Sequence, residues 1–391
     1  MDLNDFALER FLARFEFTAP HMLSASDCEP MTVGELLALA GAGADALMTL
    51  GLGYTDPTGS PWLRARIAAF YPGLSDEDVL VTNAPEEAIF IAMSTLVAPG
   101  DRVIVLTPCY QALWEVARAR GADVVAWPLV EREDGWRPDL ERLASLLASA
   151  PTRLVVVNAP HNPTGWHPDR PTWDTIVALA DRAGARLFAD EMYRGLERDP
   201  ADRLPPAASL HPAAVSLWGM SKSFGLGGLR IGWLATRDAD ARRRLLRMKD
   251  YTTICASALG ELLAHLALGE HARIWAGHRA TIDHNLDLAR GFAARTGAIA
   301  WREPRAGSVA LPRWRAGGVT ALAERLATER GLVVVPSSTF DLGDDHIRLG
   351  LGRRTFGASL EILEASLAGS AARDAASLVD GVRPGAAPDR S

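Results

Sequence analysis

The middle of the chain alternates short apolar runs with amphipathic stretches of helical period. The runs are apolar over most of their length, which is typical of strands covered on both faces in a parallel sheet. The predicted strands are Asp78–Asn83, Asp101–Pro108, Ala122–Leu129, Thr152–Pro160, Ala185–Glu191, Ala213–Met220 and Arg230–Thr236. The predicted helices between them are Glu86–Leu96, Ala112–Arg120, Leu140–Ala150 and Trp173–Ala183. This alternation predicts an α/β fold with a large, doubly wound, mostly parallel seven-stranded sheet.

The two flanks of this region have a different pattern. Residues 1–53 are predicted to be mostly helical, and residues 238–296 form long helices. Short strands are predicted at Ser308–Arg313, Gly331–Pro336 and His346–Gly350, and with the helices around them they make a small α+β domain. A length of 391 residues exceeds what one core usually supports. We therefore expect a large domain over 51–285, a small domain from 1–50 and 286–370, and a disordered tail over 371–391.

Composition and charge narrow the classes of function. The formal net charge of −7 argues against a protein that binds nucleic acid by bulk attraction to phosphate. No window approaches the roughly 18 apolar residues of a transmembrane helix, and the acidic N-terminus does not resemble a secretory signal. Cys28, Cys109 and Cys255 are too few and too widely spaced for a disulfide framework or a cysteine zinc site. We expect a cytoplasmic protein without a nucleic-acid, membrane or metal partner.

Lysine is rare in this chain. Of 41 Lys and Arg residues, only Lys222 and Lys249 are lysines. Unlike arginine, lysine can lose its proton and attack a carbonyl carbon. Lys249 ends a basic run that begins at Arg242, and chance survival on a solvated helix face is the simpler interpretation there. Lys222 directly follows a predicted strand, where α/β sheets place their ligands.

The surroundings of Lys222 indicate its chemistry. A glycine-rich turn and Arg230 follow it, and this combination suits a covalent bond to an aldehyde that carries a phosphate. The glycines do not form a G-x-G-x-x-G sequence, because position 230 is arginine, so the dinucleotide fingerprint is absent. The alternative is a surface lysine in a flexible loop.

Three other strand ends carry polar or aromatic side chains. Asp190 could pair with a pyridinium nitrogen and Tyr193 with a phenolic oxygen on the same ring, although an aspartate here could also cap the next helix. Asn162 precedes Pro163, which favours an extended backbone that presents its amide to a ligand. Tyr110 could stack on a planar ring. Taken singly, Asn162 and Tyr110 also fit an ordinary loop and a core position.

Together these motifs resemble the fold type I pyridoxal-phosphate (PLP) enzymes of the aspartate aminotransferase superfamily, the class I/II aminotransferases. The matching segments are GYTDPTGSPWLR, P-x-Y, N-x-P-x-N-P-T-G, D-x-x-Y, S-K-x-x-x-x-x-G-x-R-x-G and I-R-L-G, in family order over about residues 50–352. The resemblance implies the fold type I architecture, pyridoxal 5′-phosphate as cofactor and a homodimer with shared active sites.

The resemblance also implies a role for each matching residue. Lys222 is the catalytic residue, which forms the aldimine and moves the proton between Cα and C4′, and Asp190 pairs with the ring nitrogen. Arg348 binds the substrate α-carboxylate as a two-pronged fork, together with Asn162. Tyr54 reaches the phosphate in the neighbouring subunit. The other implied cofactor-binding residues are Ala84, Pro85, Glu86, Tyr110, Asn162, Tyr193, Ser221 and Arg230.

Three segments depart from the family pattern. Gly219 stands where a Ser or Thr phosphate ligand is usual, three residues before the lysine. The usual glycine-containing phosphate turn is replaced by residues 83–87, NAPEE, in which Pro85 removes a backbone donor and Glu86 or Glu87 brings a carboxylate to the phosphate or to the substrate. The N-terminal segment LSASDCEPMTVGELLAL resembles that of capreomycidine synthase-like members, which eliminate a group and close a ring on a hydroxy-arginine.

The sequence therefore predicts a PLP-dependent aminotransferase that acts on an L-amino acid through a Lys222 aldimine and a quinonoid intermediate. The alternative is a PLP-dependent lyase or cyclase of specialised metabolism, which the NAPEE turn and the LSASDCEP segment favour. A non-enzymatic PLP-binding regulator would need a basic DNA-binding extension, and only about 50 residues precede the sheet. His271, His278 and His284 share one predicted helix without the i,i+4 spacing of zinc ligands, so we expect them on a solvated face.

Overall fold

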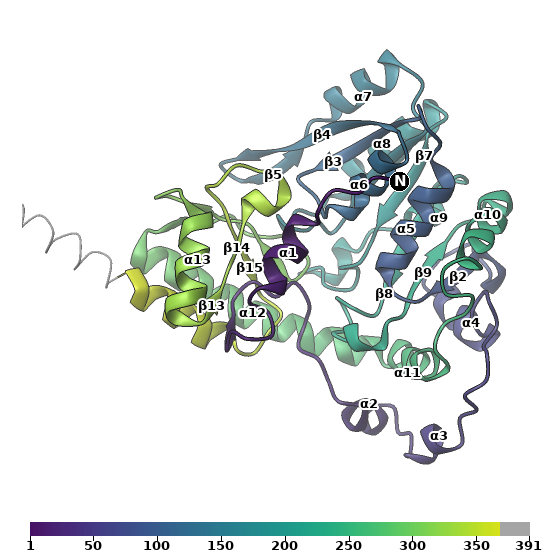
Figure 1. Ribbon diagram of the computed structural model, residues 1–391, viewed down its shortest axis with the longest axis horizontal. Coiled ribbons are helices and arrows are strands. Elements are labelled where there is room, and N and C mark those ends of the chain that lie inside the picture. Colours follow the sequence, from purple (N-terminus) through teal and green to yellow (C-terminus); the bar gives the residue numbers. More distant parts are fainter. Residues whose placement is uncertain (368–391) are drawn as a thin grey trace, which may run out of the picture.

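A single large sheet forms the centre of the larger of two lobes (Figure 1). The computed structural model describes residues 1–367. The strand order is β2-β9-β8-β7-β6-β3-β4-β5, and neighbours in the block from β8 to β4 run parallel. The strands are β2 (Val79–Thr82), β3 (Arg102–Thr107), β4 (Asp123–Arg132), β5 (Gly135–Pro138), β6 (Leu154–Asn158), β7 (Arg186–Asp190), β8 (Val215–Gly219) and β9 (Gly232–Ala235).

The sheet contains the seven predicted strands and one more. The additional strand, β5, pairs antiparallel with the end of β4 across a two-residue turn, Glu133–Asp134. Its four residues, GWRP, are too short and too polar for a recognisable apolar run. β9 also runs antiparallel, between β8 and β2.

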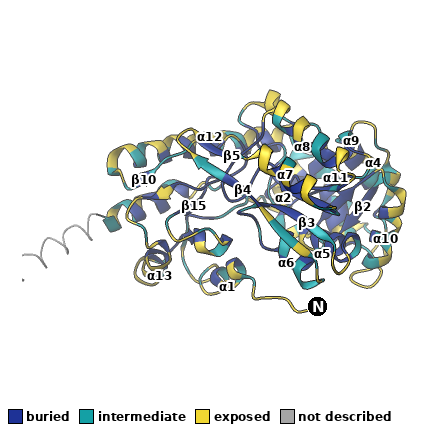
Figure 2. Cartoon of the chain, turned by 90° about the horizontal axis from the view of Figure 1, so that it is seen from above, coloured by how far each residue is buried: buried dark blue, intermediate teal, exposed yellow. Residues whose placement is uncertain are grey.

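Helices cover both faces of the sheet, and their outer surfaces are exposed (Figure 2). Val103 and Val105 of β3 pack in one core cluster with α5 and α6, whereas Ile104 and Leu106 pack in another with α7 and α8. Successive strand side chains point to opposite faces, so a strand between two helical layers is apolar throughout. The layers are formed by α5 (Pro85–Leu96), α6 (Ala112–Ala119) and α10 (Ala239–Lys249) on one face, and by α7 (Leu140–Ser149), α8 (Arg170–Arg182) and α9 (Ala207–Leu210) on the other.

The smaller lobe is built from short strands and two main helices. Its three-stranded sheet has the order β11-β15-β14, with β15 in the middle. The strands of this lobe are β1 (His21–Met22), β10 (Ile299–Ala300), β11 (Val309–Ala310), β12 (Arg313–Trp314), β13 (Leu332–Val333), β14 (Val335–Pro336) and β15 (Ile347–Gly350). Its two main helices are α12 (His271–Thr296) and α13 (Val319–Arg330), and residues 356–367 are helical as well. Helices α4 (Pro61–Ala68) and α11 (Ala258–Gly269) lie in the larger lobe, near β2.

The prediction that residues 1–53 are mostly helical is wrong. They contain three short helices, α1 (Ala7–Ala13), α2 (Val33–Leu39) and α3 (Asp45–Met48), joined by extended backbone. The extended part includes β1, which pairs with β13 of the smaller lobe. Backbone hydrogen bonds to a strand more than 300 residues away override the local helical tendency.

Two side chains expected on solvated helix faces are buried. His278 lies on the buried face of α12, where burial lowers the pKa of its imidazole. Lys249 is completely buried at the end of α10, where its Nζ donates to the carbonyl oxygens of Pro57 and Ile254. The sequence pattern of a helix predicts which residues share a face, but it does not show which face is covered by segments that are distant in the sequence.

The predicted domain limits stay a prediction, with the boundary after residue 285 falling inside α12. The predicted tail, 371–391, lies outside the described residues. Within residues 1–367, no helix has the length and apolar character needed to cross a membrane.

Candidate active site

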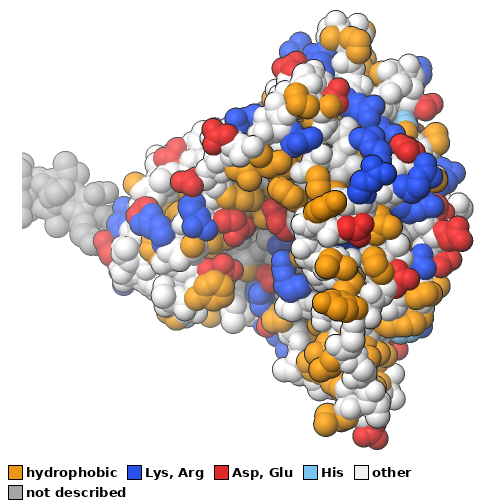
Figure 3. Space-filling view, turned by 45° about the vertical axis from the view of Figure 1, so that its right-hand side comes forward, with side chains coloured by type: hydrophobic (Ala, Val, Ile, Leu, Met, Phe, Trp, Pro, Cys, Tyr) orange, Lys and Arg blue, Asp and Glu red, His pale blue; other side chains and the backbone are white. Residues whose placement is uncertain are grey.

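A cavity of about 880 Å³ opens between the two lobes, where acidic and basic side chains meet at its rim (Figure 3). Strands β8, β7, β6 and β3 are neighbours and parallel, so their carboxyl ends meet at this edge of the sheet. Ten of the predicted site residues line the cavity: Pro85, Glu86, Tyr110, Asn162, Asp190, Tyr193, Ser221, Lys222, Arg230 and Arg348.

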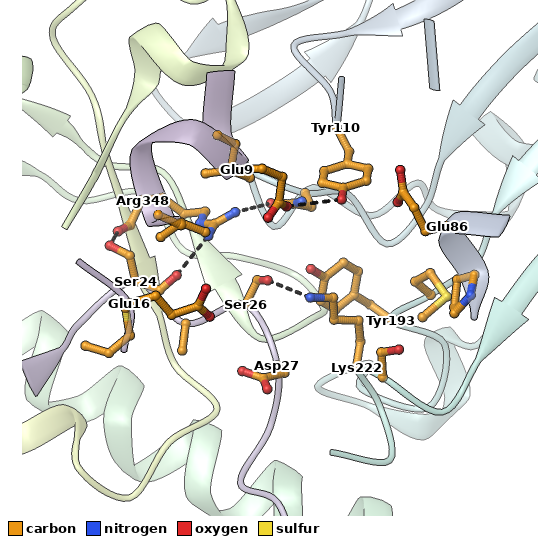
Figure 4. Close-up of a pocket in the computed structure, with 18 of the residues that line it drawn as sticks. Glu9, Glu16, Ser24, Ser26, Asp27, Glu86, Tyr110, Tyr193, Lys222 and Arg348 are labelled. Atoms are coloured by element: carbon orange, nitrogen blue, oxygen red, sulfur yellow. Dashed lines mark hydrogen bonds between the residues drawn. The ribbon is translucent and has the colours of Figure 1, made fainter. Parts of the chain in front are cut away.

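Lys222 follows β8 and extends into the cavity. Its Nζ donates a hydrogen bond to Oγ of Ser26, 2.8 Å away (Figure 4). Burial lowers the pKa of the Lys222 amine, and the nearby Arg348 guanidinium acts in the same direction. A lowered pKa raises the fraction of free amine, the form of lysine that attacks an aldehyde.

Asp190 is the last residue of β7 and is buried. Its Oδ1 accepts a hydrogen bond of 3.0 Å from the backbone N–H of Met192, and burial raises the pKa of the carboxyl to about 7. No lysine or arginine within the described residues forms an ion pair with it. A buried carboxylate in this position favours a cationic ligand group, because such a partner offsets the cost of the buried charge.

Arg348 lies at the centre of the β11-β15-β14 sheet and is 2% exposed. Its guanidinium donates to Oδ1 of Asn162 at 3.2 Å and to the carbonyl oxygen of Ser24 at 2.9 Å. Its Nε has no hydrogen-bond partner within residues 1–367. Buried polar groups are normally satisfied, and a polar ligand bound in the cavity would satisfy this one.

Helix α5 points its N-terminus at the same cavity. Pro85 stands at its first turn, preceded by Ala84 with a φ of 91°. The free N–H groups and the dipole of a helix N-terminus favour an anion, and Ser221 and Arg230 lie on the cavity wall as well.

The unusual turn and the unusual glycine are one packing arrangement. A Cβ at position 219 would lie 2.6 Å from Cγ of Pro85, so the proline ring fills the space of a Ser or Thr side chain there. A Cβ at position 232 would lie 2.5 Å from the nitrogen of Pro85. A Cβ at position 219 would also lie 2.9 Å from the carbonyl oxygen of Ile231, so close packing of the backbone, together with the proline ring, requires glycine at both positions.

The two glutamates of the turn have different surroundings. Glu87 accepts hydrogen bonds from the backbone N–H of Asn83 at 2.6 Å and from the hydroxyls of Thr252 and Thr253. It is thus held by the protein itself, and it does not line the cavity. Glu86 does line the cavity with its side chain exposed there, and partial loss of hydration raises the pKa of its carboxyl.

Two predicted site residues lie away from the cavity. Ala84 is buried behind the α5 turn, where only its backbone shapes the site. Tyr54 is 92% exposed and lines a separate surface depression with residues 255–259. Their roles in cofactor binding stay predictions.

Sequence reasoning missed the contribution of the N-terminus. Glu9 and Glu16 come from α1 and the turn after it, and Ser26 and Asp27 come from the extended segment that follows β1. The departure of LSASDCEP from the family pattern was the available signal for Ser26 and Asp27. No local pattern marks Glu9 or Glu16.

Replacing Arg348 with Lys tests the carboxylate-binding role. The variant keeps a positive charge but loses the planar pair of donors, so substrate KM is expected to rise about 10–100-fold, the equivalent of roughly 1–3 kcal/mol for a charge-assisted hydrogen bond. Steady-state kinetics across basic, neutral and acidic amino acids measures it. An increase confined to one class would contradict recognition of the shared α-carboxylate.

Comparisons with known proteins agree with this geometry. Residues 31–360 match the family model for aminotransferase class I and II. Capreomycidine synthase of Streptomyces vinaceus is 37% identical over 348 residues, 88% of each chain. A PLP-dependent aminotransferase from Streptococcus suis 89-1591 has a TM-score of 0.87 and 30% identity, and the match covers 93% of this chain and 97% of that one. The PLP-dependent cyclase OrfR has a TM-score of 0.87 and 28% identity, and the match covers 95% and 98%.

Proposed function

The chain belongs to the aminotransferase class I and II family, and we propose that within it this enzyme is a cyclase for an amino acid with a cationic side chain. Its cofactor is pyridoxal 5′-phosphate, and its substrate is an amino acid. The reaction type and the side chain are the parts that we propose.

The residues at the cavity fit this cofactor. Lys222 offers an amine for the aldehyde, and the buried Asp190 carboxylate matches a pyridinium nitrogen. The buried hydroxyl of Tyr193 on the cavity wall matches a phenolic oxygen, and the N-terminus of α5 with Arg230 matches a phosphate. When bound, the cofactor supplies an electron sink that makes the Cα proton of the substrate removable.

Within this site the protein binds the substrate and moves its protons. Arg348 binds the α-carboxylate, held in place by Asn162 and by the carbonyl oxygen of Ser24. The free amine of Lys222 removes the proton from Cα and returns one, as a general base and then a general acid.

Unpaired carboxylates around the cavity carry the proposal of a cationic side chain. Glu9, Glu16 and Glu86 line it, and within residues 1–367 none of them forms an ion pair with lysine or arginine. Two other lining acids are already engaged, since Asp27 pairs with Arg353 at 2.7 Å and Glu29 accepts from a backbone N–H. A guanidinium or ammonium group would offset the repulsion among the free carboxylates.

Helix α1 contacts both lobes beside the cavity, so Glu9 forms part of the cavity wall. The backbone N–H of Ala7 donates to Oε1 of Gln111 at 2.9 Å in the larger lobe. Arg14 pairs with Glu324 at 2.6 Å in the smaller lobe. Between these anchors Glu9 accepts a hydrogen bond of 3.3 Å from the Tyr110 hydroxyl (Figure 4).

Similarity to capreomycidine synthase and to the cyclase OrfR supports cyclisation over simple transamination. For a substrate with a hydroxyl on Cβ, the Cα–H bond, the Cβ–O bond and one N–H bond of the side chain break, and a Cβ–N bond and a new Cα–H bond form. The hydroxide from Cβ and the proton from the side-chain nitrogen leave together as one water, so the reaction needs no amino acceptor.

Products from a panel of amino acids, with and without a keto acid, test this proposal. The panel includes arginine, lysine and their β-hydroxy derivatives. Cyclisation is expected to give a product lighter by one water, without a keto acid. Product formation only with a keto acid would instead support a basic-amino-acid transaminase, the second candidate, which the match to the Streptococcus suis aminotransferase favours.

Glu9→Gln and Glu16→Gln variants test the side-chain preference in the same panel. Each is expected to raise KM for cationic substrates about 5–50-fold, because a charge-assisted hydrogen bond becomes a neutral one, and to leave neutral substrates unchanged. Glu133→Gln, in the exposed β4–β5 turn, is the matched control. Equal losses for cationic and neutral substrates would remove the argument for a cationic side chain.

We also propose a homodimer in which Tyr54 reaches the cofactor phosphate of the neighbouring subunit. Tyr54 is exposed together with Met48 and Leu52, at 92, 81 and 79%, and a second copy would cover these side chains. Light scattering is expected to give twice the chain mass of 42.0 kDa. Mixed dimers of Tyr54→Ala and Lys222→Ala subunits are expected to regain one working site, and failure to regain it would contradict shared sites.

A further inference from the structure

The segment between β1 and α2 is held rigidly against β15. The hydroxyl of Ser24 accepts from the backbone N–H of Val335 at 2.9 Å and donates to the carbonyl oxygen of Arg348. The backbone N–H of Gly350 donates to the carbonyl oxygen of Leu23 at 2.8 Å. A Cβ at position 350 would lie 1.9 Å from the carbonyl oxygen of Ala25, so the two chains approach as closely as glycine permits.

This rigid segment delivers one hydroxyl to the catalytic lysine. The carbonyl oxygen of Ser26 accepts a hydrogen bond of 2.7 Å from Ser308, which fixes its backbone. Its Oγ points into the cavity and accepts from Nζ of Lys222 at 2.8 Å (Figure 4). The neighbouring Asp27 carboxylate is turned to Arg353, so the hydroxyl and not the acid contacts the amine.

The direction of this hydrogen bond matters for proton transfer. A lysine side chain has a flexible four-carbon stem, and a free amine on it has many orientations. When Nζ donates an N–H to Ser26, the nitrogen lone pair remains available for the substrate proton. A hydroxyl acceptor also favours the ammonium form modestly, whereas a carboxylate would favour it strongly.

We propose that Ser26 is a positioning residue that orients Nζ of Lys222 for proton transfer at the substrate Cα. The inference rests on the proposed function only in requiring that Lys222 exchange the Cα proton. Transamination, elimination and cyclisation all include this step. In this proposal, the unusual LSASDCEP segment contributes to catalysis through Ser26. The carboxylates that we propose for side-chain recognition are different residues.

The isosteric pair Ser26→Thr and Ser26→Val tests the role of the hydroxyl. Exchange of the Cα proton with deuterium oxide in the holoenzyme is expected to fall about 10–100-fold in the Val variant, with KM changed less than about threefold, since a misplaced reacting group costs up to about 100-fold. The Thr variant is expected to stay within about threefold of the wild type. Ser145→Ala, on the exposed side of α7, is the remote control.

A second measurement uses the cofactor-free full chain. The pKa of Lys222 is obtained from the pH dependence of its labelling by an amine-directed reagent, and the peptide of buried Lys249, whose Nζ donates to two backbone carbonyl oxygens, is the negative control for labelling. Loss of the acceptor removes an interaction with the ammonium form, so the pKa is expected to be about 0.5–1 unit lower in the Val variant than in the Thr variant. A purely structural role would leave this difference at zero.

The outcomes separate the two hypotheses. If Thr and Val variants exchange equally fast, or if their Lys222 pKa values coincide, Ser26 does not position the lysine. If the wild type exchanges no Cα proton with any amino acid of the panel, the proposed function itself fails, and this inference falls with it.

Discussion

Replacing Lys222 with Ala is expected to lower turnover at least about 10³–10⁴-fold, because the protein loses both its nucleophile for the cofactor and its general base. Lys222→Arg is the matched variant: it keeps a cation at the end of β8 but stays protonated, so it is expected to be equally inactive. Steady-state assays of the reconstituted variants measure both.

The rarity of lysine makes the covalent part of this prediction unambiguous. Borohydride reduction of the holoenzyme is expected to fix the cofactor on the peptide with Lys222, and peptide mass spectrometry distinguishes it from the only other lysine, Lys249. Lys249 is enclosed and donates to two backbone carbonyl oxygens, so its amine is already occupied. An adduct on Lys249, or a Lys222→Ala variant with more than a tenth of the normal turnover, would refute the assignment.

Asp190→Asn has the second-largest expected effect. The amide has the same shape and keeps an oxygen for the N–H of Met192, but it carries no charge to balance a protonated ring nitrogen. We expect turnover to fall about 10²–10³-fold, the size of effect seen when a preorganised electrostatic contact is removed, with cofactor still bound. Absorbance of the bound cofactor and turnover are measured together.

The neighbouring residue provides the control for this variant. Glu191 is also buried at the end of β7, but its carboxylate accepts from Ser216 and from the backbone of Ala207, away from the cavity. Glu191→Gln is expected to lower stability while turnover per folded molecule remains normal. Similar turnover losses in both variants would mean that burial of a charge, and not contact with the ring, explains the effect of Asp190.

Two departures from the family pattern, Pro85 and Gly219, lie against each other in the structure although they are far apart in the sequence. Gly219 and Pro85 stand 134 positions apart, and each is unusual when viewed alone. In space the ring of Pro85 and the carbonyl oxygen of Ile231 both lie where a side chain at position 219 would stand. Packing between distant segments therefore excludes a side-chain hydroxyl at this position.

The N-terminal segment illustrates where sequence patterns stop being informative. Ser26 reaches Lys222 across 196 positions, and Glu9 meets Tyr110 across 101. No local pattern predicts either contact. Ser26 lies in an extended segment whose preceding residues are held by hydrogen bonds to β13, β14 and β15, and Glu9 lies on α1, which packs beside a strand end of the larger lobe. Contacts with distant segments also explain why residues 1–53 are not mostly helical and why Lys249 is not on a solvated face.

The sequence by itself determined seven of the eight strands of the large sheet and the four residues at strand ends, Lys222, Asp190, Asn162 and Tyr110. These follow from local rules: apolar runs between helices make parallel strands, and their carboxyl ends share one edge. Only the tertiary structure decided which carboxylates face the cavity, that Glu87 is held by Thr252 and Thr253 while Glu86 is not, and that a serine contacts the lysine. Those outcomes depend on contacts between distant segments, which close packing selects and no local pattern encodes.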